Sequence, residues 1–148
     1  MSLSDQLNQE IKAAMLARDA DTLSTLRLLK SAIGYSQIEQ KKESLTDAEL
    51  IAIVQKEVKK RKDSVEQYES GGRPELAAKE KSEVAVLEKF LPKPLSAEEL
   101  EALVNATIQE VGATSKKDMG MVIKAVQAKA AGRAEGKTIS GLVGKLLP

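Results

Sequence analysis

Apolar residues recur along this chain at intervals of three and four positions, which is the spacing of one face of an α-helix. The longest such stripe comprises Leu50, Val54, Val58, Arg61, Val65 and Tyr68. Arg61 is its one charged member, so we expect a partly buried stem and a paired guanidinium. Glu57 lies four residues earlier on the same helix, and Glu80 and Glu83 on the next helix are the candidate partners across the packing.

Capping signals divide this pattern into seven helices. Two of them are capping boxes, Thr46 with Glu49 and Ser96 with Glu99, in which each residue of the pair satisfies a free backbone N–H at the helix start. The predicted N-caps of five helices are Ser2 or Ser4, Asp21, Thr46, Ser96 and Ser115. Glycines and Pro74 mark the remaining boundaries. Strand signals are missing, so the predicted class is all-α.

A Pro-Lys-Pro segment at positions 92–94 interrupts the pattern between two separately capped groups of helices. Proline cannot continue a helix, so we expect a hinge here. The predicted organisation is an N-terminal four-helix unit over residues 1–92, followed by a C-terminal three-helix bundle over residues 95–148.

The composition excludes several classes of chemistry. The 148 residues include no His and no Cys, which rules out His-based acid–base catalysis, thiolate nucleophiles, disulfides and the usual zinc sites. No loop of the type that presents a Ser nucleophile or cradles phosphates is present, so we expect no catalytic residue, no metal and no cofactor. The first fifteen residues contain no continuous apolar segment of signal-peptide length, and no apolar run in the chain exceeds five residues. We therefore expect a soluble, cytoplasmic protein.

Charge is unevenly distributed in the second half of the chain. Residues 96–111 carry four acidic residues and no basic one, whereas residues 112–148 carry seven basic residues and two acidic ones. Such a basic set is typical of a surface that binds nucleic-acid phosphates. It is also compatible with a solvated surface that serves solubility, because no aromatic residue is available there to stack on bases. The candidate RNA-binding residues are Lys116, Lys117, Gly120, Lys124, Lys129, Arg133 and Lys137. Gly120 lies inside a predicted helix, where it costs about 1 kcal/mol relative to Ala, which indicates close helix packing or, alternatively, the close approach of a ligand.

Several segments resemble the YqeY-like family, which shares a domain with the C-terminal tail of the GatB subunit of the tRNA-dependent amidotransferases. The resemblance covers essentially the whole chain and is most specific at positions 132–137, Gly-Arg-Ala-Glu-Gly-Lys. The other matching segments are residues 26–33, 59–61, 72–77, 90–92 and 118–122. Phe90 stands where a Tyr is common in the family, and Glu135 where an Asp is common.

The resemblance implies a two-part helical fold whose C-terminal helices contact tRNA. It implies no catalysis by this chain alone, since the catalytic parts of those enzymes lie in other domains. Three functions stay open at this point. The first is a tRNA-binding adaptor; the second is a protein–protein module that takes a partner helix; the third is an accessory part of glutamine-dependent carbon–nitrogen ligation, with amidotransferase subunits as partners.

Overall fold

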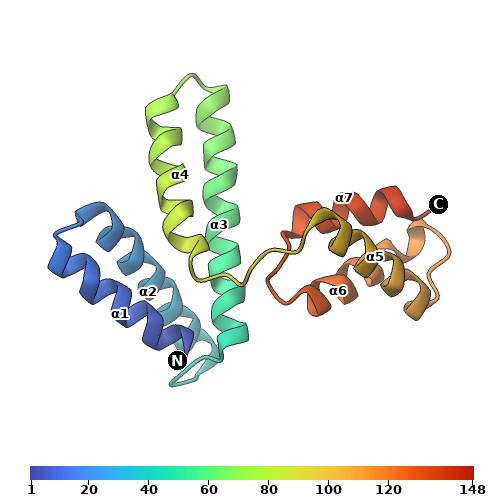
Figure 1. Ribbon diagram of the computed structural model, residues 1–148, viewed down its shortest axis with the longest axis horizontal. Coiled ribbons are helices and arrows are strands. Elements are labelled where there is room, and N and C mark those ends of the chain that lie inside the picture. Colours follow the sequence, from blue (N-terminus) through green and yellow to red (C-terminus); the bar gives the residue numbers. More distant parts are fainter. The chain divides into compact units, whose positions relative to one another are not determined.

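The computed structural model describes all residues, 1–148, and contains helices but no strand. The predicted all-α class is confirmed. The chain divides into two compact units, Met1–Leu91 and Pro92–Pro148, each with its own apolar core. Figure 1 shows the helices of both units, with colours that follow the sequence from blue α1 to red α7. None of the helices is long and apolar enough to cross a membrane.

The first unit consists of two helical hairpins. The first hairpin is α1 (Leu3–Ala17) with α2 (Ala20–Gln40), and the second is α3 (Asp47–Ser70) with α4 (Pro74–Glu88). In Figure 1 the two helices of each hairpin run side by side and are joined by a short turn. The core contains Leu7, Ala14, Leu26, Leu29, Val54, Val58, Val84, Leu87 and Phe90. All four helices contribute, so burial of one shared apolar surface holds the two hairpins together.

The helix boundaries of this unit follow local signals, with one error. Thr46 and Glu49 form the predicted capping box, and Gly71 follows the last residue of α3. The predicted N-cap of α2 was wrong: Asp19 caps it, because its carboxylate accepts hydrogen bonds from the N–H and the hydroxyl of Thr22 at 3.1 and 2.7 Å. Asp21 instead lies in the first turn of α2, where its carbonyl oxygen accepts from the Thr25 hydroxyl.

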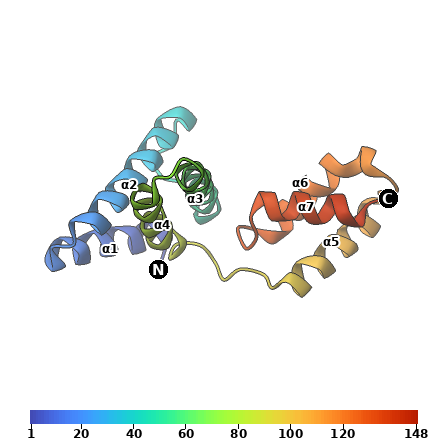
Figure 2. The ribbon, with the colours of Figure 1, turned by 90° about the horizontal axis from the view of Figure 1, so that it is seen from above.

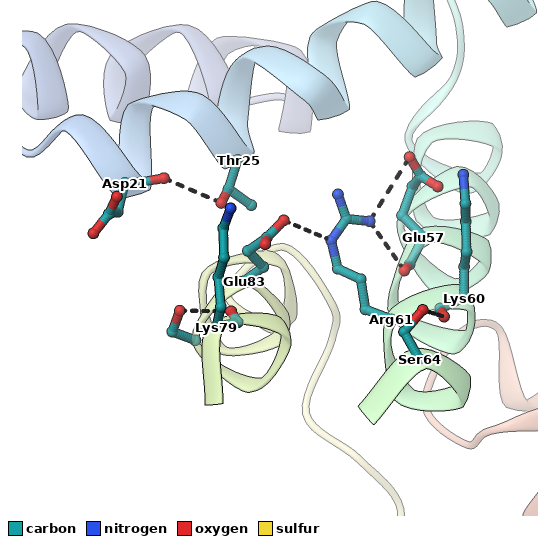
Figure 3. Close-up of polar contacts among 9 residues, drawn as sticks. Asp21, Thr25, Glu57, Lys60, Arg61, Ser64, Lys79 and Glu83 are labelled. Carbon is teal, nitrogen blue, oxygen red and sulfur yellow. Dashed lines mark hydrogen bonds and ion pairs between the residues drawn. The ribbon is translucent and has the colours of Figure 1, made fainter. Parts of the chain in front are cut away.

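Arg61 joins the two helices of the second hairpin, as Figure 3 shows. Its side chain is 10% exposed, and its Nε donates to Glu83 Oε1 on α4 at 3.2 Å. Its Nη1 donates to the carbonyl oxygen of Glu57 at 3.2 Å and lies 3.9 Å from the Glu57 carboxylate. The expected burial and pairing are confirmed, and of the two candidates on α4 the partner is Glu83.

The second unit packs three helices around a core of small and branched side chains. These helices are α5 (Ala97–Val111), α6 (Met119–Ala130) and α7 (Gly136–Leu146), and a 3₁₀ turn, η1 (Lys116–Asp118), precedes α6. Figure 2 shows them from a second direction, with α6 beside α7. Val104, Val122, Val126 and Val143 are completely buried. The second predicted capping box, Ser96 with Glu99, is confirmed, whereas Ser115 caps η1 rather than α6 itself.

Candidate nucleic-acid interface

Three of the predicted residues lie on one exposed track that begins in η1 and continues along α6. Lys117, Gly120 and Lys124 are separated by three and four positions, so they share one side of this helical segment. All three are exposed, and Lys116 is exposed beside them. The opposite side of α6 carries the buried residues Val122, Val126 and Ala130. Because these buried residues face the core, the track on the other side of the helix faces solvent.

A matching track lies on α7, and the sequence-based set contained only its first residue. Lys137, Gly141 and Lys145 follow one another at intervals of four, and all are exposed. Ile139 and Val143 occupy the buried side of the same helix. Lys145 counted among the basic residues of this region but was not a predicted site residue. The four-residue spacing of Lys137, Gly141 and Lys145 is visible in the sequence and could have added Lys145 to the predicted site.

The two tracks belong to an antiparallel pair of helices. A Cβ built on Gly136 would lie 3.2 Å from Gln127 Nε2, and one built on Gly144 would lie 3.2 Å from Met119 Cε. The start of α7 therefore packs beside the end of α6, and the end of α7 beside the start of α6. Lys145 thus lies in the part of α7 that packs beside the start of α6, and Lys137 in the part that packs beside the end of α6.

The lysines of the two tracks are available to an outside ligand. The ammonium groups of Lys116, Lys117, Lys124, Lys137 and Lys145 have no hydrogen-bond or ion-pair partner within the chain. Lys129 differs, since it pairs with Glu110 across the α5–α6 contact. Arg133 also differs, because it donates to the carbonyl oxygen of Lys93 at 2.9 Å and lies 3.9 Å from Glu99. The structure therefore divides the predicted set into free cations and cations with structural partners.

Gly120 does not serve close helix packing, so that interpretation was wrong. A Cβ added at Gly120 meets no atom within 4 Å, and the same holds for Gly141 on α7. Gly141, inside α7, thus costs about 1 kcal/mol of helix propensity relative to Ala, and neither it nor Gly120, the second residue of α6, allows a closer contact inside the protein. What each one does provide is bare backbone at the surface, between two lysines.

Acidic side chains of this unit concentrate on α5. Glu98 and Glu101 are exposed in its first turns, and Glu99 completes the capping box. Hydrogen bonds from the Ser96 hydroxyl and N–H, together with the nearby charge of Arg133, hold the pKa of Glu99 below its usual range. No group of three or more Asp or Glu side chains is arranged to hold a metal ion. The acidic side chains of the second unit thus lie mainly on α5, whereas its free lysines lie on η1, α6 and α7.

Comparison with known families matches residues 4–147 to the family described as Yqey-like protein. The chain belongs to the YqeY-like family. The match covers both units, so the predicted resemblance is confirmed over nearly the entire sequence.

Several relatives of this chain come from yeasts. An uncharacterized protein of Schizosaccharomyces pombe is 33% identical over 95 residues, which are 64% of this chain and 76% of that protein. "Altered inheritance of mitochondria protein 41, mitochondrial" of Eremothecium gossypii is 33% identical over 110 residues, 73% of this chain and 60% of that protein. The protein of the same name from Saccharomyces cerevisiae is 31% identical over 93 residues, 62% of this chain and 50% of that protein. The matched part thus spans only half to three fifths of these two mitochondrial relatives.

These names contradict the expected cytoplasmic location, because the relatives from Eremothecium gossypii and Saccharomyces cerevisiae are named mitochondrial proteins. The expectation rested on the lack of an apolar leader. Mitochondrial targeting segments are amphipathic and rich in Arg and Ser rather than apolar. The lack of an apolar segment at the start of the sequence therefore could not distinguish a cytoplasmic from a mitochondrial location.

Proposed function

We propose that this member of the YqeY-like family is a tRNA-binding adaptor whose second unit contacts RNA phosphates through the exposed face of η1, α6 and α7. The observation that carries the proposal is the pair of Lys-Gly-Lys tracks, Lys117–Gly120–Lys124 and Lys137–Gly141–Lys145. Their lysines are exposed and have no partner inside the protein. A solvated surface that serves solubility alone has no need of two helical glycines in open space.

The chemistry of the tracks suits a phosphate backbone better than base edges. Lysine ammonium groups bind phosphates as point charges, and a helix surface without a side chain lets a backbone strand approach closely. No aromatic residue lies within η1, α6 or α7 to stack on a base. Recognition should therefore follow the shape and charge of the RNA rather than its sequence.

Salt dependence of tRNA affinity tests the proposal. Each lysine–phosphate contact contributes to a linear fall of log K with log salt concentration, at about 0.7 to 0.9 per contact. The double variant Lys117→Glu/Lys124→Glu should bind bulk tRNA more weakly and show a salt slope flatter by roughly one to two units. Different tRNAs should respond alike, because phosphate contacts do not read sequence.

A matched control is available on α3. Lys56 and Lys60 are also exposed and four positions apart on one helix, so Lys56→Glu/Lys60→Glu makes the same change of charge elsewhere. This control should keep most of the wild-type affinity and slope. Equal losses in the two double variants would make the effect one of net charge and remove the tracks as the site. Wild-type protein that fails to bind tRNA even at low salt would reject the adaptor and leave a protein partner, such as an amidotransferase subunit, in its place.

A further inference from the structure

The segment that joins the two units is held by different parts of the protein at its two ends. Phe90 is buried in the core of the first unit, and Leu91 packs against the same core. Leu95 packs against the core of the second unit. Between them lies the Pro-Lys-Pro sequence, residues 92–94, which the helical pattern predicts to be a hinge over its whole length.

Arg133 fastens the second part of this segment from two directions. Its Nε donates to the carbonyl oxygen of Lys93 at 2.9 Å, and its own carbonyl oxygen accepts from the Leu95 N–H at 2.8 Å. The two bonds bracket Pro94, which has no N–H to donate. Backbone on either side of this proline is therefore tied to a single residue about forty positions later in the sequence.

The position of Arg133 is itself fixed. It follows Ala131 and Gly132, two residues with positive φ (47° and 88°) that reverse the chain between α6 and α7. Its N–H donates to the Ala130 carbonyl oxygen at 2.9 Å. On its outer side the guanidinium lies 3.9 Å from Glu99, whose other oxygen accepts from the Ser96 N–H at 3.3 Å. Arg133 thus connects the α6–α7 turn, the start of α5 and the joining segment.

We infer that Arg133 is a clamp that makes residues 93–95 part of the second unit and confines the flexible joint of the chain to the backbone between Phe90 and Lys93. A joint of this length permits rotation about few backbone bonds, and the fixed φ of Pro92 removes one of them. Without the Arg133 side chain, the mobile stretch would extend through Lys93 and Pro94 as far as Leu95, which packs against the core of the second unit. The inference concerns motion within the chain and does not depend on whether tRNA binds.

Backbone relaxation of the full-length protein tests the clamp, with the Lys93 carbonyl carbon (¹³C′) and the Leu95 amide (¹⁵N) as probes, because these are the two groups that Arg133 holds. In the wild type, both groups should have order parameters near those of the helices, about 0.85. In Arg133→Met, which keeps the aliphatic stem but removes every donor, the Lys93 value should fall below about 0.6. Leu95 should fall less, because its bond to the Arg133 carbonyl oxygen does not involve the side chain.

Lys129→Met is the matched control, since it removes another cation of the same unit that pairs with α5. It should leave the Lys93 carbonyl as ordered as in the wild type. A wild-type Lys93 as mobile as the chain ends would overturn the inference even if the Arg133 variant failed to fold. An ordered Lys93 in a folded Arg133→Met protein would overturn it as well.

Discussion

Arg61 Nε and Glu83 Oε1 lie 3.2 Å apart and form an ion pair between α3 and α4 in which both side chains are at most 15% exposed. The pair lies beside the second partner of Arg61, the Glu57 carbonyl oxygen (Figure 3). Loss of one member of such a pair leaves the other poorly solvated, so the penalty is larger than that of breaking a surface pair.

Glu83→Ala should therefore lower the free energy of unfolding by about 1–3 kcal/mol, because it leaves the Arg61 guanidinium without its partner on α4. Urea denaturation followed by circular dichroism measures this change. Lys81→Ala breaks an exposed pair with Glu69 between the same two helices and should cost less than about 1 kcal/mol. Equal costs would show that the buried pair is no more important than the exposed one.

Acid sensitivity should depend on Glu49. The Lys42 ammonium, 2.8 Å from its carboxylate, and the hydrogen bonds from Thr46 lower the pKa of Glu49 from 4.5 to about 2. The unfolded chain takes up this proton at a higher pH than the folded protein does. The stabilising contribution is consequently complete above the unfolded pKa and is lost as the pH falls from about 4.5 toward about 2.

Unfolding experiments between pH 2 and pH 6 (roughly the range spanned by these pKa values) should show a smaller loss of stability with falling pH in Glu49→Gln than in the wild type. The pKa of Glu99 is shifted in the same direction by its own capping box, so some acid dependence should persist in the variant. Parallel curves for the two proteins would contradict the assignment to Glu49.

Glycine substitutions should have opposite effects at two positions of the second unit. Gly141 lies inside α7 with nothing within 4 Å of an added Cβ, so Gly141→Ala should raise stability by up to about 1 kcal/mol. Gly112 has φ of +69° after α5, where Ala is strained, so Gly112→Ala should lower stability by about 1 kcal/mol. Thermal unfolding of both variants checks the signs. A Gly141→Ala protein that is more stable but binds tRNA less well would support a close approach of RNA at that site.

The second unit should fold when produced alone as residues 92–148. It has its own core and its own capped helices, although so short a chain buries little apolar area and should be only marginally stable. Circular dichroism should show a helical spectrum with a cooperative thermal transition. A fragment starting at residue 95 lacks the Lys93 carbonyl that Arg133 binds, so it should melt at a lower temperature. A random-coil spectrum for the longer fragment would contradict the autonomy of this unit.

Features encoded by residues close together in sequence were predictable, and features that depend on distant partners were not. The two capping boxes and the place of Arg61 on an apolar stripe could be predicted because their signals lie within one helix. The choice between Asp19 and Asp21 as N-cap could not be made, since each is followed three positions later by a hydroxyl residue.

The candidate site shows the same division. A Cβ added at Gly120 would meet no atom within 4 Å, and the hydrogen-bond partner of Arg133, the Lys93 carbonyl oxygen, is forty positions away in the sequence. Neither fact can be obtained from the local spacing of residues. The basic character of residues 112–148 was visible in the sequence. Which of those cations are free was decided by the packing of α5, which provides partners for Lys129 and Arg133.

The separation of acidic α5 from basic α6 and α7 gives the second unit an electric dipole moment. Glu98 and Glu101 lie on α5, whereas the free lysines lie on the other helices. In the electric field of a polyanion, the second unit would experience a torque that turns its free lysines toward the negative charges before contact. Encounters would then begin with the unit already oriented, which raises the association rate at low salt more than it raises affinity.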